Sequence, residues 1–100
     1  MANPHRIIGD ENSWVEFKAQ GYPFRLRKDL HEASDDEAVL KLVIPYIVAC
    51  NISKIDGGTL TKIESIDDLY SIDEKLALNI IWSFYDFRAE RQREPLPKGT

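Results

Sequence analysis

Cys50 and His31 are the residues whose types could support nucleophilic catalysis, as a thiol and its general base. A reactive cysteine needs a partly exposed, electropositive setting, because the thiolate is the nucleophile. The three residues before Cys50 are Ile47, Val48 and Ala49, which is the setting of a small buried apolar side chain. The two histidines, His5 and His31, are far apart and do not give a zinc-ligand spacing with Cys50. We therefore interpret Cys50 as structural.

The segment Asp56-Gly57-Gly58 invites comparison with a calcium-binding loop. With Gly57 as the loop glycine, the first, third and last ligand positions would be Ile52, Lys54 and Ile63. None of these offers a side-chain oxygen to Ca²⁺. The segment also lacks the lysine and the following helix of a phosphate-binding loop. We interpret it as a tight turn, and we predict a non-enzymatic protein with no catalytic residue, cofactor or metal.

Composition indicates one globular domain: the chain has 100 residues, 43% hydrophobic and 30% charged. The formal net charge of −4 argues against a nucleic-acid partner, which requires clustered positive charge. We interpret Arg25, Arg27 and Lys28 as a solvated strand face. Residues 1–8 lack the apolar core of a signal peptide, and the apolar run Leu42–Cys50 is short for a span of about 20 residues. We expect a cytoplasmic protein with no membrane partner.

The stretch 34–51 contains the most strongly marked helix. Ser34 and Glu37 have the spacing of a capping box, and two aspartates occupy the first turn. From Ala38 to Cys50 only Lys41 is charged, so this helix should be buried on most sides.

Pro45 leaves two outcomes for this stretch. Inside a helix it removes a hydrogen bond and meets the carbonyl of Lys41, at a cost of about 3 kcal/mol. The helix is then either kinked and continues to Cys50, or it ends near Ile44 and Tyr46–Ile52 forms a strand, as its β-branched residues favour. We favour the kinked helix because the capping signal is strong.

Two runs of alternating apolar residues, 14–19 and 22–27, flank Gly21 and predict an N-terminal β-hairpin. Because an isolated hairpin is marginal in water, its apolar face should lie on helices or on another chain. Residues 1–12 are expected to form a flexible N-terminal arm or a short edge strand.

The second half of the chain predicts short elements and then a long helix. The turn at 56–58 should join a short hairpin, and Ser65 should cap a helical turn at 65–70. A second S-x-x-E box at 71–74 should open a last helix, about Ile72 to Arg91. Residues 92–100 contain two prolines and are expected to be a disordered tail.

The last helix has an unusually wide apolar surface. Five polar residues recur every three or four positions and form one stripe: Lys75, Asn79, Ser83, Asp86 and Glu90. Nearly all other residues from 76 to 87 are apolar, so the apolar arc exceeds the roughly 100° that seats a helix on one core. We expect part of it to be an interface. The alternative is that the hairpin and the helix at 38–50 cover both sides.

These patterns predict an α+β fold that is mostly α, in which an N-terminal β-hairpin packs on two main helices with a short helical turn between them. The globular domain should span 13–91.

The order of elements gives a family resemblance. The chain begins its pattern with Trp14-Val15-Glu16-Phe17 and residues 22–27, which are followed by an acidic-capped apolar helix. Asn51 and the Asp56-Gly57 turn come next, and the chain ends with an aromatic-rich helix and a Pro-rich tail. From about Trp14 to Arg91 this pattern resembles the small tail assembly chaperones of long-tailed bacteriophages and prophages.

The resemblance implies a non-enzymatic chaperone of the bacterial host cytoplasm that aids tail morphogenesis. Its partners would be the helical tape measure protein and, in addition, the tail tube protein, and it would be a homo-oligomer. By inference we place the partner contact on Ile81, Trp82, Phe84 and Tyr85, with Trp14 and Tyr22 as a second patch on the hairpin. The alternative function is a small protein-binding regulatory module of a bacterium or prophage with a different globular partner.

Overall fold

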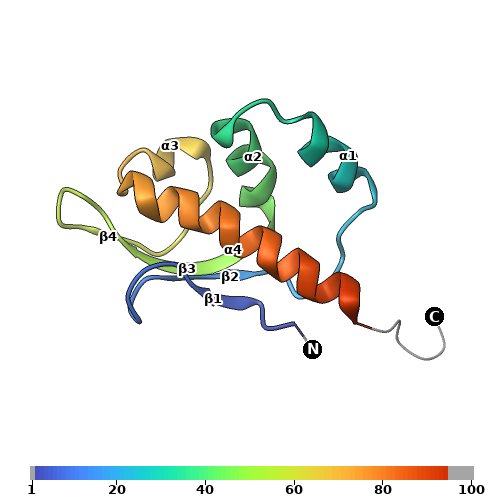
Figure 1. Ribbon diagram of the computed structural model, residues 1–100. Helices are drawn as coiled ribbons and strands as arrows, with labels where there is room; N and C mark the ends of the chain where they lie inside the picture. The colour runs from blue at the N-terminus through green and yellow to red at the C-terminus, as the bar shows by residue number, and fades with distance from the viewer. Residues whose placement is uncertain (1, 95–100) are drawn as a thin grey trace.

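The computed structural model describes residues 2–94, which form an antiparallel sheet and a set of helices (Figure 1). The strands are β1 (His5–Ile7), β2 (Trp14–Phe17), β3 (Ile47–Ser53) and β4 (Thr59–Leu60). The helices are α1 (Arg25–Glu32), α2 (Asp36–Val43), α3 (Ile66–Leu69) and α4 (Glu74–Arg93), with a 3₁₀ turn, η1 (Ile44–Tyr46), after α2. The α+β class expected from the sequence is confirmed.

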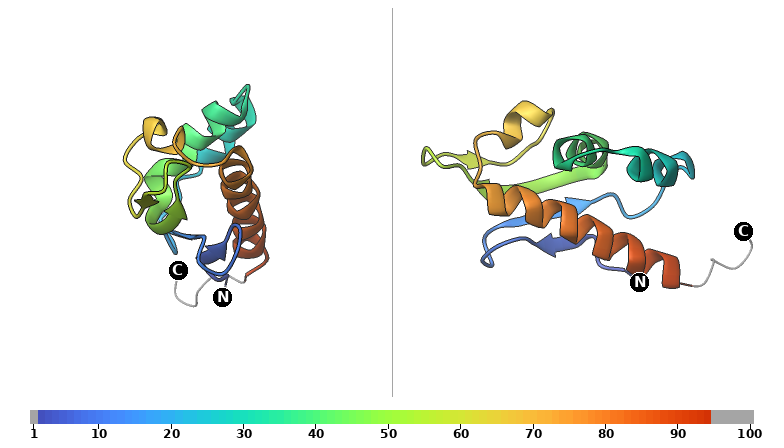
Figure 2. Two further views of the ribbon diagram at one scale, coloured as in Figure 1. Left: turned by 90° about the vertical axis from the view of Figure 1, so that its left-hand side faces the viewer. Right: turned by 45° about the horizontal axis from the view of Figure 1, so that its top comes forward.

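The sheet has the strand order β1-β2-β3-β4, and the helices cover one of its faces (Figures 1 and 2). Val15 lies opposite Cys50 in the β2–β3 register, and both side chains are buried beneath the helices. Trp14 and Glu16 alternate with Val15 and point to the other face, because successive strand residues face opposite sides.

Helix α4 supplies much of the core. Ile80, Ile81, Phe84 and Phe87 are buried along its inner side. The ring of Phe17 lies edge-on to that of Phe84, with centroids 5.2 Å apart, and stacks on Phe87 at 5.7 Å. Aromatic pairs in these arrangements add stability beyond the area they bury. This packing fixes which side of α4 is left facing outward.

The N-terminal hairpin differs from the predicted one. The partner of β2 is β1, which comes from the segment 1–12, where the sequence left open an arm or an edge strand. Residues 22–27 do not form a strand: α1 begins at Arg25, and the amide of Leu26 donates to the carbonyl of Pro23 at 3.0 Å. Leu26 and Leu30, one helical turn apart, are both buried. Helical spacing, rather than the two-residue alternation, therefore decides the structure of this segment.

The kinked helix favoured at Pro45 is also wrong, and the other outcome holds. Helix α2 ends at Val43, Pro45 lies in η1, and β3 follows. At the start of a short turn the missing N–H of proline needs no partner, which removes the penalty it would have inside a helix. The cap also shifts by one residue, since Asp35, not Ser34, accepts a hydrogen bond from the amide of Ala38 at 2.8 Å.

The turn at 56–58 is confirmed. It joins β3 to β4, the amide of Lys54 donates to the carbonyl of Gly58 at 2.7 Å, and Gly57 has a φ of 99°. Ser65 caps α3 as expected. The carboxylate of Asp68 accepts from the amides of Glu64 and Ser65, at 2.8 and 3.2 Å, and these bonds lower the pKa of Asp68.

Helix α4 begins later than the sequence suggested. Asp73 caps it by accepting from the amide of Lys75 at 2.8 Å, whereas the hydroxyl of Ser71 donates to the carbonyl of Asp68 at 2.9 Å. The helix continues to Arg93, so it includes the first residues of the tail expected at 92–100. The prolines of that tail lie outside the described residues.

The beginning of the chain is attached to the end of α4 (Figure 2). The amide of Ala2 donates to the carboxylate of Glu94, and Arg6 forms an ion pair with Glu90 at 2.7 Å. β1 and the last turns of α4 therefore support each other.

Candidate partner-binding surface

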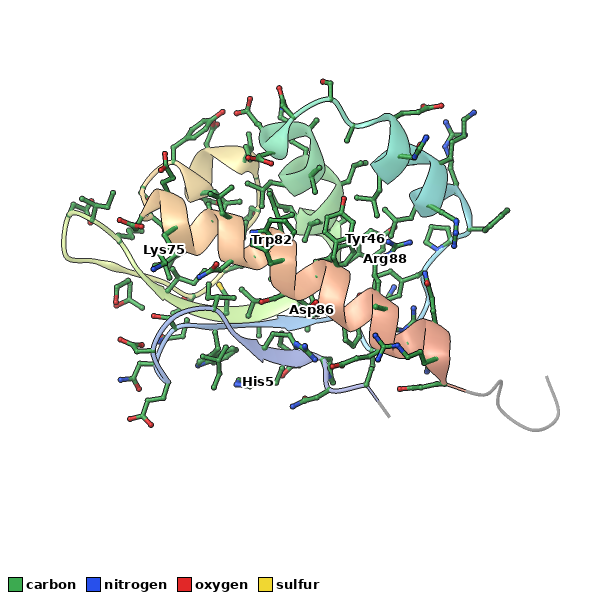
Figure 3. The ribbon with its side chains drawn as sticks, in the orientation of Figure 1. His5, Tyr46, Lys75, Trp82, Asp86 and Arg88 are labelled. Atoms are coloured by element: carbon green, nitrogen blue, oxygen red, sulfur yellow. The ribbon has the colours of Figure 1, made fainter. Side chains whose placement is uncertain are left out.

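Helix α4 carries an apolar stripe on its outward side. Leu78, Trp82, Tyr85 and Ala89 follow one another at spacings of four, three and four, which places them on one side of a helix. We call these four residues the α4 stripe. Trp82, midway along the helix, has 65% of its surface exposed, and the other three are half-buried (Figure 3).

An apolar cleft adjoins the stripe between α2, α3 and the first turns of α4. It has a volume of about 470 Å³. Its apolar lining includes Leu40, Ile66, Leu69, Ile72, Ala77 and Leu78. Three carboxylates also line it, those of Asp36, Glu37 and Glu74. Because Leu78 belongs to both features, the cleft and the α4 stripe form one apolar surface.

Two further apolar side chains extend this surface. Ile55, beside the β3–β4 turn, and Tyr70, at the end of α3, both line the cleft and are exposed. Exposed apolar groups that gather around a groove typically mark an interaction site. Neither residue was predicted as a site residue from the sequence, although each is a large apolar residue beside a turn or helix end, where little chain is available to cover it.

The four site residues predicted on α4 divide into two pairs. Trp82 and Tyr85 belong to the outward stripe. Ile81 and Phe84 are buried in the core, and Phe84 has no exposed surface. In this fold the first pair is accessible at the surface and the second is not.

Tyr22 has mainly a packing role. Its ring stacks on Tyr46 with centroids 4.7 Å apart, and the guanidinium of Arg91 lies 4.5 Å above it. Its hydroxyl donates to the carbonyl of Lys18 at 2.7 Å. Burial raises the pKa of Tyr22 to about 12, against an opposing effect of Arg91. These contacts hold the segment before α1 against α4.

Trp14 lies on the face of the sheet away from the helices. Its ring is 4.7 Å from that of His5, and its β1 neighbour is the exposed Ile7. Tyr22 is on the helix side, with its ring 6.1 Å from that of Phe84. The structure therefore does not join Trp14 and Tyr22 into one patch.

The local environment of Cys50 disfavours a nucleophilic role. The side chain is buried and its sulfur is 3.6 Å from the carbonyl oxygen of Leu60. Burial, and secondarily the charge of Asp68, raises the pKa of Cys50 to about 11. A thiol with such a pKa is almost entirely protonated at neutral pH, so it is a poor nucleophile.

Within residues 2–94, no three His, Cys, Asp or Glu side chains gather in a way that could hold a metal ion. The same part of the chain contains no helix with the length and apolar character needed to cross a bilayer. Comparisons of the chain with protein-family models, curated proteins and solved structures give no match. The α4 stripe and the adjoining cleft are therefore the candidate functional features of this chain.

Proposed function

We propose that this protein is a non-enzymatic phage tail assembly chaperone that binds the tape measure protein in the bacterial host cytoplasm and aids tail morphogenesis. Two things support the proposal: the resemblance in the order of elements, and the apolar surface on α4. The observation that carries it is the 65% exposure of Trp82 in the middle of a heptad-spaced stripe.

The mode of binding that fits this surface is a helix in a groove. A partner helix with apolar residues at helical spacing would lie along the α4 stripe and insert one or two side chains into the cleft. Trp82 would be the central anchor, since buried tryptophans often dominate the energy of an interface. The carboxylates of Asp36, Glu37 and Glu74 at the cleft favour a partner helix with lysine or arginine beside its apolar residues.

Chaperone action follows from this binding mode. A long helical protein that awaits assembly exposes apolar faces that would otherwise aggregate. Covering those faces reversibly keeps the protein soluble until tail tube subunits replace the chaperone around it. Self-association through the same stripe belongs to this proposal, because one protomer offers the type of helix face that the other would bind.

The second candidate is a small protein-binding regulatory module with a different globular partner. The cleft has a volume of about 470 Å³, and a cleft of this size suits one short helix of a globular protein. This size supports the regulatory module.

The test begins with the neighbouring genes, which should include a very long helical reading frame for the tape measure protein. Its product is then expressed alone, with the wild-type chain and with Trp82→Asp, and its soluble fraction is measured. We expect wild type to keep it soluble and Trp82→Asp to fail, because a carboxylate at the anchor cannot be buried in an apolar contact.

The matched control is Lys41→Asp, which places the same side chain at an exposed position of α2 that does not line the cleft. It should protect the tape measure protein as wild type does. Loss of protection in both variants, or in neither, would contradict the assignment of the α4 stripe. Copurification with one globular partner, and no effect on tape measure solubility, would favour the regulatory module.

A further inference from the structure

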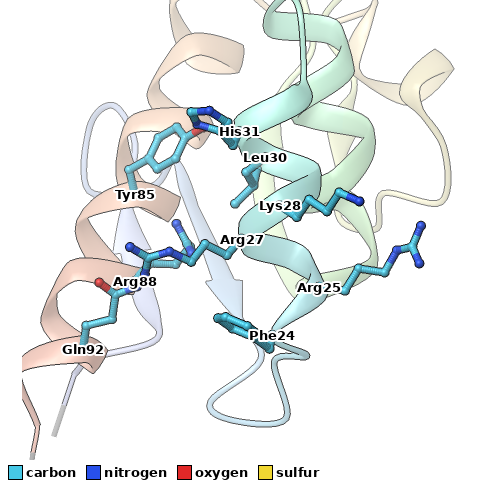
Figure 4. A pocket seen from close by; sticks show the side chains of 9 residues that line it. All are labelled: Phe24, Arg25, Arg27, Lys28, Leu30, His31, Tyr85, Arg88 and Gln92. Carbon is cyan, nitrogen blue, oxygen red and sulfur yellow. The ribbon is translucent and has the colours of Figure 1, made fainter.

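A second groove, on a different side of α4, is basic. It lies between α1 and the last turns of α4 and has a volume of about 910 Å³ (Figure 4). Phe24, Arg27 and Leu30 line it from the α1 side, and Tyr85 and Arg88 from α4. We call it the α1–α4 groove. It stands out on a chain with a formal net charge of −4.

Two guanidinium groups in this groove lack a carboxylate partner. On α1, Arg25 pairs with Asp29 at 3.6 Å and Lys28 with Glu32 at 3.9 Å. Within residues 2–94, no carboxylate oxygen lies within 4 Å of the guanidinium nitrogens of Arg27 or Arg88. Two cations therefore remain for a ligand.

These two arginines face each other across the groove (Figure 4). Partial burial lowers the pKa of Arg88, and the positive charges of Arg27 and Arg91 lower it further, against an opposing effect of Tyr85. Like charges held close together raise the energy of the empty groove. An anion bound between Arg27 and Arg88 would relieve this repulsion.

The groove also presents apolar surface beside its charges. Phe24 has 88% of its surface exposed, and Leu30, in the last turn of α1, is buried. A ligand that matches this lining needs an anionic group and an apolar side chain close together. Carboxylates suit the planar guanidinium fork, which can bind both oxygens of one group.

We infer that the α1–α4 groove binds a carboxylate-rich peptide segment of a partner protein, with its carboxylates on Arg27 and Arg88 and an apolar side chain against Phe24. A nucleic acid fits less well. Its sites take several phosphate contacts, whereas this groove offers two unpaired guanidiniums with Asp29 and Glu32 on the same helix. The inference does not depend on the tape measure proposal, because Arg27 and Arg88 belong neither to the cleft nor to the α4 stripe. Tyr85 is the residue of the α4 stripe that also lines the groove.

The test measures fluorescence anisotropy of a labelled glutamate-rich peptide that carries a single leucine. Wild type should bind it, more weakly as salt is raised. Arg27→Glu/Arg88→Glu should bind it at least about tenfold more weakly, because both ligand cations are replaced by like charges. Arg27→Lys/Arg88→Lys should fall between the two, since it keeps the charges and loses the forks.

The control is Arg93→Glu, at an exposed position of α4 outside the groove, which should bind the peptide like wild type. Circular dichroism checks that each variant is folded, and Arg27→Glu alone replaces the double variant if the latter does not fold. No binding by wild type, or equal binding by the charge-reversed variant, would overturn the inference. Preferential binding of a single-stranded oligonucleotide over the peptide would also overturn it, in favour of a nucleic-acid site.

Discussion

Phe84 and Trp82 are two positions apart on α4 and have opposite surroundings. Phe84 contacts Phe17 and has no exposed surface, whereas Trp82 is 65% exposed. A separation of two residues turns a helix by about 200°, so one side chain faces the sheet and the other faces outward. This difference predicts that Phe84 contributes mainly to the stability of the fold and Trp82 mainly to binding.

Phe84→Ala should lower the free energy of unfolding by about 3 to 5 kcal/mol, because it leaves a cavity in the core. Trp82→Ala should change it by less than about 1 kcal/mol, because most of that side chain is already in water. Urea denaturation followed by circular dichroism measures both values. A stability loss from Trp82→Ala as large as that from Phe84→Ala would mean that Trp82 belongs to the core of the single chain.

Cys50 predicts a pH dependence of stability. Its pKa in the fold is raised to about 11, so the unfolded thiol ionises first as pH rises. The stability that the neutral Cys50 thiol contributes is therefore fully present below the unfolded pKa of about 8.5, and it is lost as pH rises toward the folded pKa. From pH 8 to pH 10 this loss should be on the order of 2 kcal/mol.

The measurement compares urea denaturation at these two pH values in wild type and in Cys50→Ala. The variant should be less stable at pH 8, with a smaller loss between the two pH values, because no thiol is left to ionise. An equal loss in the two proteins would show that ionisation of Cys50 does not contribute.

At the scale of elements, the parts with local signals were predictable. The turn at Gly57, the cap at Ser65 and the existence of α4 each follow from a few adjacent residues. The segments that were predicted wrongly depend on distant partners. Strand β3 forms because Cys50 pairs with Val15, which is far away in the sequence, and capping residues carry no information on such pairing.

The candidate surface could likewise be predicted from the sequence only in part. The width of the apolar arc on α4 indicated that part of its apolar surface would lie outside the core, and Trp82 is exposed. The width of the arc could not distinguish Trp82 and Tyr85 from the buried Ile81 and Phe84, because the position of the sheet decides which side of α4 is buried. The cleft was not predictable, since it requires α2, α3 and α4 to be placed relative to one another.

The β3–β4 turn gives a prediction at this scale. Gly57 has a φ of 99°, a conformation that other residues adopt at a cost, and a Cβ there would meet no neighbouring atom. Gly57→Ala should therefore destabilise the fold through backbone strain alone, by about 1 to 2 kcal/mol.

Gly58→Ala is the matched control, because Gly58 does not have a positive φ and a Cβ there would make only ordinary contacts. It should be close to neutral in thermal denaturation. Equal losses in the two variants would show that the turn does not depend on the conformation of Gly57.

At the scale of the whole molecule, α4 borders two candidate binding regions that meet at Tyr85. The apolar surface runs from the cleft beside α2 along the stripe to Tyr85, and the basic groove lies against α1. Under the two proposals above, one region would bind an apolar helix and the other an acidic segment.

Self-association through the stripe is testable by sedimentation velocity. Wild type should show concentration-dependent association, and Trp82→Asp should shift it toward the monomer, because the introduced charge would have to be desolvated at the interface. Lys41→Asp should sediment like wild type. An unchanged mass distribution for Trp82→Asp would exclude this stripe as the self-association surface.

The burial of Trp82 by another chain can be observed directly by fluorescence. In Trp14→Phe, Trp82 is the sole tryptophan, and its emission reports on its own exposure. We predict solvent-exposed emission in dilute protein, and a blue shift with protection from acrylamide quenching when the tape measure protein is added. A tryptophan that is already shielded in dilute protein, or one that stays equally quenchable in the presence of that partner, would contradict the assignment of the α4 stripe as the binding surface.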